Sequence, residues 1–205
     1  MDEYPEKLLV SLCNNPEMID FVKGYPGNTG MAAGELTDKE LRAKIPHLLQ
    51  WDKRWGYAAY GENNMVALAG CAPTCMSMVI VGLTGNEAAT PDAIADYAMQ
   101  NGFYVEGTGT AWSLMTEGGQ QWGVYGREIS LMENNIVSEL EAGHPIICSV
   151  HAGDFTVEGH FIVLVGVEDG KIRLNDPNSI SRSNQLWDYS ELEGQISNLW
   201  VFNKY

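Results

Sequence analysis

The chain has 205 residues, of which 45% are hydrophobic and 19% are charged, a composition typical of a globular protein of one domain. Its 27 acidic and 12 basic residues give a formal net charge of −15, which disfavours nucleic acid and anionic lipid as partners. No apolar run reaches the ~18 residues that a membrane-spanning helix needs. The four cysteines have no spacing typical of a disulfide framework.

The first 45 residues are predicted to form a helical N-terminal extension. Asn15 is a candidate helix cap, with Pro16 at the first helical position. Thr37 and Glu40 have the spacing of a capping box before a further helix. This segment offers no catalytic chemistry, so we expect residues 1–45 to pack on the main domain.

The remaining residues, 46–205, are predicted to form an α+β domain. After an aromatic and glycine-rich loop, helices are expected over residues 71–83, 90–102, 109–123 and 130–143. Short β-branched and aromatic runs then predict strands over residues 145–152, 160–167, 171–176 and 198–204. Helices followed by strands indicate an antiparallel sheet with the 71–83 helix packed against it.

Two of the four cysteines lie in the segment "GCAPTC", where a loop is predicted to become a helix. Proline is tolerated in the first turn of a helix, so Pro73 places the helix start near Cys71. Free amide N–H groups and the positive end of the helix dipole then favour the nucleophilic thiolate of Cys71. Cys75, one turn further along, lies among apolar residues and is predicted to be a core residue.

Other interpretations of this pair are less favoured. A disulfide needs a Cβ separation and dihedral that residues one turn apart rarely reach. A zinc site needs further ligands, and no second close pair of cysteines or histidines is present, so no metal or cofactor is expected. Cys13 and Cys148 are predicted to be core residues. For Cys71, a structural and a reactive role stay equally open until a partner base is found.

Four histidines are candidates for that base. His144 is expected at a surface turn, His47 lies in a loop and His151 ends a strand. His160 directly follows a glycine and opens the strand predicted over residues 160–167. A histidine at a strand start is partly open and held by the sheet, as a general base requires.

Asp176, at the end of the next strand, is the candidate for holding the His160 imidazole. A two-residue turn between these strands would direct the two side chains to opposite faces of the sheet. A three-residue loop that pairs Val167 with Lys171 makes them diagonal neighbours on one face, with Cα atoms ~7–8 Å apart. The second register is favoured because Gly170 stands at the left-handed position of the common three-residue hairpin.

Cys71, His160 and Asp176 together favour acyl transfer through a thioester. The tetrahedral intermediate of such a reaction needs hydrogen-bond donors for its oxyanion. The backbone N–H of Cys71 is one natural donor, and the upstream side-chain amide of Gln50 is the candidate for the second.

The segments "QWDKRWGYAAYG", "GCAPTCMSMVIVGLTG", "GHFIVLVGV" and "LNDPNS" resemble, in this order, the peptidase C39-like family. Its members are related to bacteriocin-processing cysteine peptidases and have a papain-like fold. The resemblance covers about residues 46–205. It implies a catalytic glutamine matched by Gln50, a nucleophile matched by Cys71, a base matched by His160 and an orienting acid matched by Asp176.

Two positions depart from the family pattern. Ala72 and Cys75 stand where relatives often have glycine and serine, and neither change removes a catalytic group. Many stand-alone relatives are secreted by Gram-positive bacteria, which implies a secreted or cell-surface protein. The start "MDEYPEKLLVSLC" lacks the features of a signal sequence, so secretion would need a signal that has been removed, and a cytoplasmic location stays an alternative.

The leading interpretation is therefore a papain-like cysteine peptidase that acts on a peptide or protein. Trp51, beside Gln50, and Trp112, in a glycine-rich loop, are weaker candidates for contact with substrate. One alternative is a peptide-binding module on the same fold without turnover. Another is a thiol amidase or acyltransferase with a non-protein substrate, because the same catalytic groups serve all these reactions.

Overall fold

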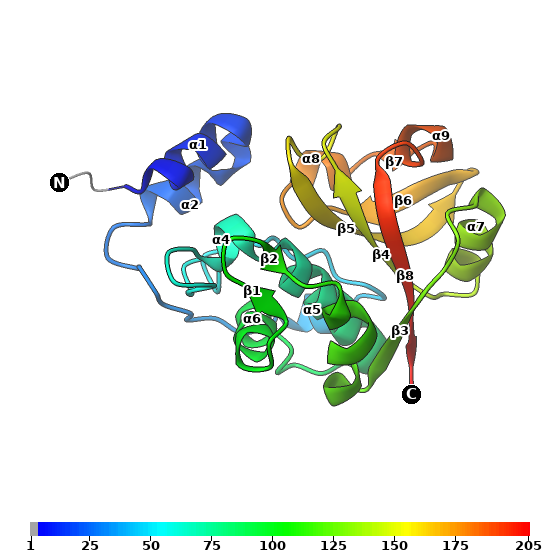
Figure 1. Cartoon of the computed structure of the whole chain (residues 1–205), viewed down its shortest axis with the longest axis horizontal. Helices are drawn as coiled ribbons and strands as arrows, with labels where there is room; N and C mark the ends of the chain where they lie inside the picture. The colour runs from blue at the N-terminus through cyan, green and yellow to red at the C-terminus, as the bar shows by residue number, and fades with distance from the viewer. Residues whose placement is uncertain (1–3) are drawn as a thin grey trace.

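The computed structural model describes residues 4–205 and has the α+β architecture that the sequence predicts. Figure 1 shows a helical half beside a twisted sheet, with helices α1 and α2 at one end of the molecule. The sheet is antiparallel, in the order β3-β8-β4-β5-β6-β7. Within the described residues, no helix is both long and apolar enough to cross a membrane.

The helices that precede the sheet follow the capping signals of the sequence. Thr37 and Glu40 form both hydrogen bonds of a capping box at the start of α3. The Asn15 side chain accepts from the backbone N–H of Glu17 and caps the short helix η1. The bounds are α1 Glu6–Asn14, η1 Pro16–Met18, α2 Ile19–Lys23, α3 Asp38–Arg42, α4 Val66–Ala69, α5 Cys71–Thr84 and α6 Pro91–Gln100.

Residues 1–3 of the predicted extension lie outside the described residues, and the rest of it packs on the helical half. Leu8, Phe21 and Val22 are buried in a small core with Trp51 and Tyr57 from the following loop. The rings of Phe21 and Tyr57 stack at 4.2 Å, and the Tyr57 hydroxyl donates to the Phe21 carbonyl. The extension is thus attached through aromatic packing to the loop that contains Gln50.

The sheet half contains the four predicted strands and two that the sequence analysis missed, β3 and β7. Both lie at the edges of the sheet, where a strand needs less apolar sequence than in the centre. The bounds are β3 Val124–Glu128, α7 Glu133–Glu141, β4 Ile146–His151, β5 Gly159–Glu168, β6 Lys171–Asn175, α8 Ile180–Ser183, β7 Leu186–Trp187, α9 Tyr189–Leu192 and β8 Ile196–Lys204.

The helix predicted over residues 109–123 is wrong. A small hairpin of β1, Tyr104–Val105, and β2, Gly109–Thr110, is followed by the π-helical turn η2, Leu114–Gly118, and the 3₁₀ turn η3, Gln120–Trp122. Glycine at positions 118, 119 and 123 explains the interruption, because glycine costs about 1 kcal/mol relative to alanine in a helix interior.

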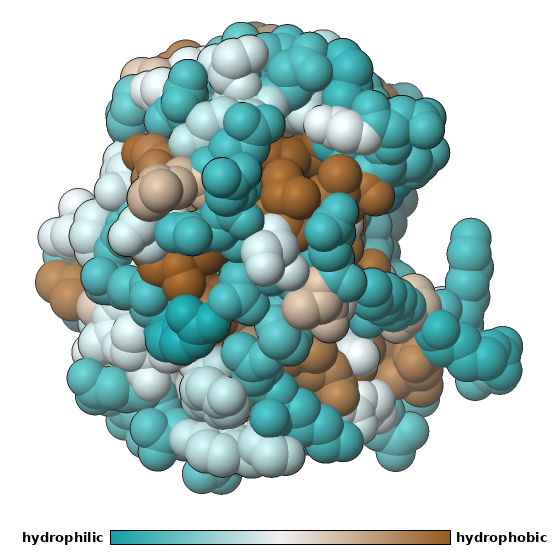
Figure 2. Space-filling model, turned by 90° about the vertical axis from the view of Figure 1, so that its right-hand side faces the viewer, coloured by the Kyte–Doolittle hydropathy of each residue, from teal (hydrophilic) through white to brown (hydrophobic). Residues whose placement is uncertain are grey.

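Helix α5 lies in the core, where it packs against α6 and against strand β5 of the sheet. All residues from 72 to 81 are buried, which explains why this helix is apolar all round. Alternate residues of the sheet contact different cores: Ile147 and Val163 pack with α5, whereas Ile146 and Ile162 pack with α7. The end of the molecule that carries β8 and α7 has a mostly hydrophilic surface with separate apolar patches (Figure 2).

The β5–β6 hairpin places Asp176 near His160, but not by the predicted turn. Val167 pairs with Ile172 rather than with Lys171, so the predicted three-residue loop is wrong. The turn has two residues, Asp169 and Gly170, with φ of 52° and 75°, as a type I′ turn requires. The prediction of a positive φ at Gly170 is correct.

The β5–β6 register is shifted by an extra residue inside β5 and not by an extra residue in the turn. The pairing skips Val165, so that Leu164 pairs with Leu174 and Gly166 with Arg173. This bulge moves every residue before it by one position relative to the partner strand. Val163 therefore pairs with Asn175, and the same register continued by one residue puts Asp176 opposite Ile162, as in the predicted arrangement.

Candidate active site

Cys71 occupies the first position of α5, as predicted from Pro73. The preceding α4 ends at Ala69, and only Gly70 separates the two helices. A Cβ at residue 70 would lie 2.6 Å from the Val66 carbonyl oxygen, so the tight junction requires glycine. This junction leaves Cys71 partly exposed at the helix N-terminus, where amide N–H groups have no partner within the helix.

The other cysteines differ from Cys71 in their surroundings. Cys75 is fully buried in the core of the helical half, and burial raises its pKa well above the usual value. Cys148 is buried in the second core, and burial likewise raises its pKa. Cys13 is exposed on α1, so the prediction that it is a core residue is wrong. All four are free thiols.

His160 and Asp176 form a buried pair. The Nε2 atom of His160 lies 2.7 Å from Oδ1 of Asp176, and the two side chains are 7% and 0% exposed. Burial alone would lower the pKa of His160, but the charge and hydrogen bond of Asp176 outweigh it, so the pKa is raised. The nearby Cys71 side chain raises this pKa further. His160 thus contacts the acid through Nε2, which leaves Nδ1 as the ring nitrogen for the thiol.

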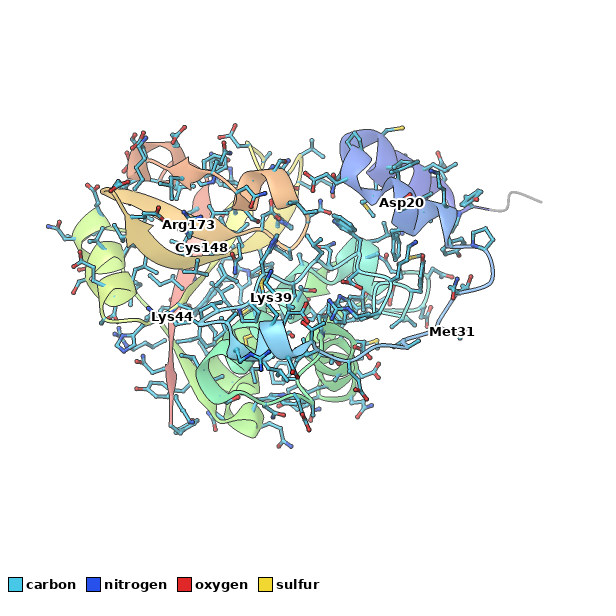
Figure 3. The ribbon with its side chains drawn as sticks, turned by 180° about the vertical axis from the view of Figure 1, so that it is seen from behind. Asp20, Met31, Lys39, Lys44, Cys148 and Arg173 are labelled. Atoms are coloured by element: carbon cyan, nitrogen blue, oxygen red, sulfur yellow. The ribbon has the colours of Figure 1, made fainter. Side chains whose placement is uncertain are left out.

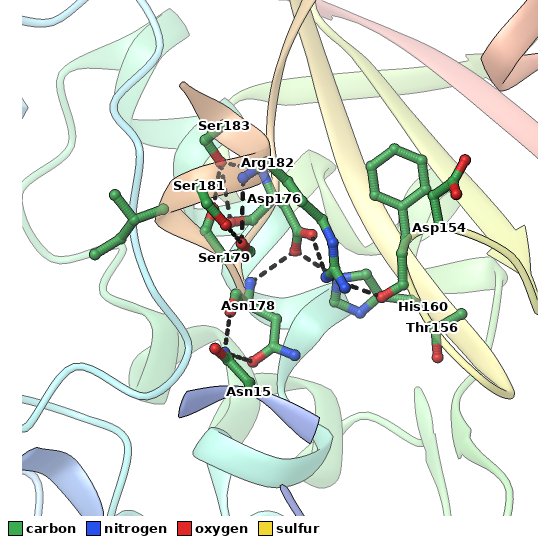
Figure 4. A network of polar contacts seen from close by, with 12 residues as sticks. Asn15, Asp154, Thr156, His160, Asp176, Asn178, Ser179, Ser181, Arg182 and Ser183 are labelled. Atoms are coloured by element: carbon green, nitrogen blue, oxygen red, sulfur yellow. Dashed lines mark hydrogen bonds and ion pairs between the residues drawn. The ribbon is translucent and has the colours of Figure 1, made fainter. Parts of the chain in front are cut away.

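Asp176 is held by three donors. Its Oδ1 accepts from the Asn178 backbone N–H at 2.8 Å as well as from His160, and its Oδ2 accepts from Nη1 of Arg182 at 3.1 Å (Figure 4). Burial would raise the pKa of Asp176, but these donors and the charge of His160 lower it. The carboxylate therefore stays ionised although its side chain is buried.

The turn that follows Asp176 is closed by its own serines. The Ser183 hydroxyl accepts from the Asp176 backbone N–H at 2.9 Å and donates to the Ser179 carbonyl at 2.7 Å. His47 contacts the same turn, with Nε2 at 2.7 Å from the Asp176 carbonyl oxygen and 3.0 Å from the Ser183 hydroxyl. Burial lowers the pKa of His47, so its neutral form donates to that carbonyl.

Gln50 lies beside this turn and is 4% exposed. Its backbone N–H donates to the Pro177 carbonyl at 2.8 Å, and its Nε2 donates to the Ala67 carbonyl at 2.8 Å. The Oε1 atom is buried without a partner in the described part of the chain. Because Nε2 carries two hydrogens and Ala67 takes one, the second is free to donate to another acceptor.

This geometry can be compared with known proteins. The sequence profile of the Peptidase C39-like family matches residues 42–204. The chain belongs to this family. No curated protein matches this C39-like chain in sequence.

Two solved structures resemble the C39-like chain at low sequence identity. One is the peptidase domain of Streptococcus ComA, a bi-functional ABC transporter involved in quorum sensing, with a TM-score of 0.51 and 17% identity. That match covers 67% of this chain and 93% of the ComA domain. The other is a Bacillus anthracis protein described as a C39-like peptidase, with a TM-score of 0.46, 14% identity and coverage of 67% and 90%. The likeness to the ComA domain supports the papain-like fold.

A cleft of about 400 Å³ in the C39-like chain opens beside Gln50. The loop between β4 and β5 forms one wall with Phe155 and Val157, and the turn after Asp176 contributes Arg182. The N-terminal segment contributes Asn15 and Glu17 to the same lining. The lining is mostly polar and includes Gln50 but neither Cys71 nor His160.

The two tryptophans named as weaker substrate contacts differ in exposure. Trp51 is 9% exposed, packs in the core of the N-terminal segment and donates from Nε1 to the Asn178 carbonyl at 3.0 Å. Its surface is therefore largely used inside the protein. Trp112 is 47% exposed and stacks edge-on against the buried Trp200, so its outer face is open.

Sequence analysis did not identify Arg182, Asn178 or the role of His47. Arg182 follows Asp176 by six residues in a serine- and asparagine-rich turn, a spacing without a known signature. Its guanidinium contacts both the Asp176 carboxylate and the Phe155 carbonyl at 3.1 Å. Only the folded turn brings these groups together.

Proposed function

We propose that this chain is a cysteine peptidase whose catalytic domain spans residues 46–205. The observation that carries the proposal is the buried His160–Asp176 pair, with a partly exposed Cys71 at the N-terminus of α5 close enough to raise the pKa of this histidine. Family membership independently supports the same class of activity. The polar cleft beside Gln50 fits the backbone and small polar side chains of a peptide substrate.

The reaction starts with transfer of the Cys71 proton to Nδ1 of His160. The thiolate Sγ attacks the carbonyl carbon of the scissile bond, a C–S bond forms, and the carbonyl oxygen becomes an oxyanion. Two donors receive this charge: the backbone N–H of Cys71 and the free amide hydrogen of Gln50. Asp176 keeps the imidazole oriented and stabilises its protonated form.

His160 then donates its proton to the leaving amine, the C–N bond breaks, and the acyl group remains on Cys71 as a thioester. His160 next removes a proton from water, and the hydroxide oxygen attacks the thioester carbonyl. Collapse of this second intermediate releases a carboxylic acid and restores the Cys71 thiol. No redox partner or external co-reactant other than water is needed.

The proposal predicts cleavage that depends on Cys71 and not on Cys75. A peptide library should be cut by the wild-type protein and by Cys75→Ala, whereas Cys71→Ala should be inactive. Mass spectrometry of acid-quenched reactions should find an acyl mass added to the peptide that contains Cys71. If Cys71→Ala cuts as fast as the wild type, the proposal is wrong.

A further inference from the structure

The N-terminal segment reaches the turn that carries Asp176 through two side chains. Nδ2 of Asn15 donates to the Asn178 carbonyl at 2.5 Å (Figure 4). The Glu17 carboxylate accepts from the backbone N–H groups of Ile180 at 2.6 Å and Ser181 at 3.1 Å. These contacts join parts of the chain more than 160 residues apart.

The Glu17 contacts are those of a fixed carboxylate rather than a solvated one. Besides the two amides, its Oε1 accepts from the Ser179 hydroxyl at 3.3 Å. Partial burial would raise the pKa of Glu17, but these donors outweigh it and lower the pKa. Charge-assisted hydrogen bonds of this kind are about twice as strong as neutral ones, so Glu17 restrains the start of α8.

The Asn15 contact continues directly to the histidine. Asn178 accepts from Asn15 through its carbonyl and donates through its N–H to Oδ1 of Asp176, which is bonded to His160. One residue therefore separates the N-terminal segment from the proposed catalytic acid. Trp51 donates to the same Asn178 carbonyl, so this oxygen is held from two sides.

The segment is itself anchored and can transmit this restraint. Leu8 and Phe21, on either side of η1, are 0% and 2% exposed in the core shared with Trp51. The matched family region begins only at residue 42, so Asn15 and Glu17 lie outside it. The turn that carries Asp176 is thus held in part by residues that the matched domain does not include.

We propose that Asn15 and Glu17 are positioning residues that hold the 176–183 turn so that Asp176 meets Nε2 of His160. The inference rests on the proposed function of Cys71 and His160. Neither residue touches the reacting atoms. Loss of their contacts lets Asp176 move away from His160, so the protonated imidazole that stabilises the Cys71 thiolate is less favoured.

Matched variants separate this role from general stability. Glu17→Ala removes all three contacts, and Glu17→Gln keeps the length and one acceptor oxygen. Asn15→Ser keeps an acceptor that caps η1 but removes the donor to Asn178. Asp20→Ala is the control, because it removes a carboxylate from the same segment (Figure 3) whose side chain is 80% exposed. Within residues 4–205 its one ion pair is with Lys23, at 3.7 Å.

Two readouts are needed on each full-length variant. Hydrogen exchange should become about tenfold faster at the amides of Ile180 and Ser181 in Glu17→Ala, because one lost charge-assisted bond is worth about that factor. The iodoacetamide rate at Cys71 should fall about fivefold to tenfold at pH 6 and be nearly unchanged at pH 9, as expected for a displacement of the acid limb by up to about one pH unit. Glu17→Gln should lie between Glu17→Ala and wild type in both.

The outcomes distinguish the two proposals. Exchange and alkylation equal to those of Asp20→Ala in both Glu17 variants would overturn the positioning role while the peptidase proposal stands. Faster exchange with an unchanged alkylation profile would also overturn it, since the turn would then loosen without moving Asp176. If Cys71 of the wild-type protein is not alkylated faster than the other cysteines, the proposed function fails. In that case hydrogen exchange still tests Glu17 separately: unchanged exchange at Ile180 and Ser181 in Glu17→Ala would show that Glu17 does not restrain the turn.

Discussion

The structure contains two buried or partly buried clusters of charged side chains, one centred on Arg54 and one on Asp176. They differ in whether every hydrogen-bonding group in the cluster has a partner. Arg54 is the centre of the first cluster. Its five N–H groups make five hydrogen bonds, to both oxygens of Glu40, both oxygens of Asp52 and the Glu35 carbonyl. Its guanidinium also stacks on Trp55, at 4.1 Å from the ring centroid.

In the second cluster, around Asp176, one ring nitrogen of His160 is not bonded to the carboxylate. Both oxygens of Asp176 are occupied, but His160 uses only Nε2 for the acid, and in the proposed mechanism its other nitrogen exchanges a proton with Cys71. A saturated cluster can only fix the chain, whereas a cluster with one open ring nitrogen beside a partly exposed thiol can take part in a reaction. Burial and ion pairing alone therefore do not mark a catalytic site.

The largest effect is expected from Asp176→Ala. Without the carboxylate, His160 loses both its orientation and the charge that raises its pKa, and we expect peptide hydrolysis to fall about a hundredfold or more. The steady-state rate on a peptide found with the library checks this. Asp52→Ala, which removes a carboxylate from the Arg54 cluster, should retain activity. If both variants lost peptide hydrolysis equally, the two clusters could not be distinguished as catalytic and structural.

Arg54→Ala should produce the opposite pattern, with lower stability and unchanged chemistry. We expect a loss of about 2 kcal/mol in the free energy of unfolding at pH 7, less than for a fully buried pair because the Arg54 side chain is 25% exposed. Urea unfolding measures this, and the rate of peptide cleavage at pH 7 should stay within about twofold of wild type. A stable variant that loses cleavage would show that this cluster also supports the site.

The smallest effect is the acid dependence of the same cluster. Burial would raise the pKa of Glu40, but Arg54 and Thr37 outweigh it and lower the pKa to about 2. Because the folded pKa lies below the unfolded one, this stabilisation is present above about pH 4.5 and is lost as pH falls toward 2. The stability difference between wild type and Arg54→Ala should therefore shrink over this range in urea titrations; a constant difference would contradict the assignment.

The sequence predicts which residues form the site better than it predicts the strand register that brings them together. Pro73 locates Cys71 at a helix start, and this prediction is correct because proline restricts the backbone locally. His160 and Asp176 lie on one face as predicted, but through a bulge at Val165 rather than a longer turn, and nothing in an apolar strand marks which residue leaves the ladder.

Sequence patterns do not predict polar contacts between residues that are far apart in the chain. Asn15 was recognised as a helix cap, which its side-chain oxygen is, but its nitrogen bonds Asn178, 163 residues away. Arg182 and Glu17 likewise gain their partners only when the turn after Asp176 is folded. Cys13 was misplaced because a small apolar residue on an amphipathic helix can lie on either side of its boundary.

The central claim is that Cys71 and His160 share a proton as a thiolate–imidazolium pair, and cysteine alkylation tests it most directly. Iodoacetamide should be applied from pH 5 to 9 and the label mapped by mass spectrometry, with exposed Cys13 as an internal reference and buried Cys75 as a second one. Cys71 should react faster than Cys13 below pH 7, and His160→Ala should abolish this advantage. Labelling of Cys13 ahead of Cys71 at every pH, with no effect of His160→Ala, would contradict the account.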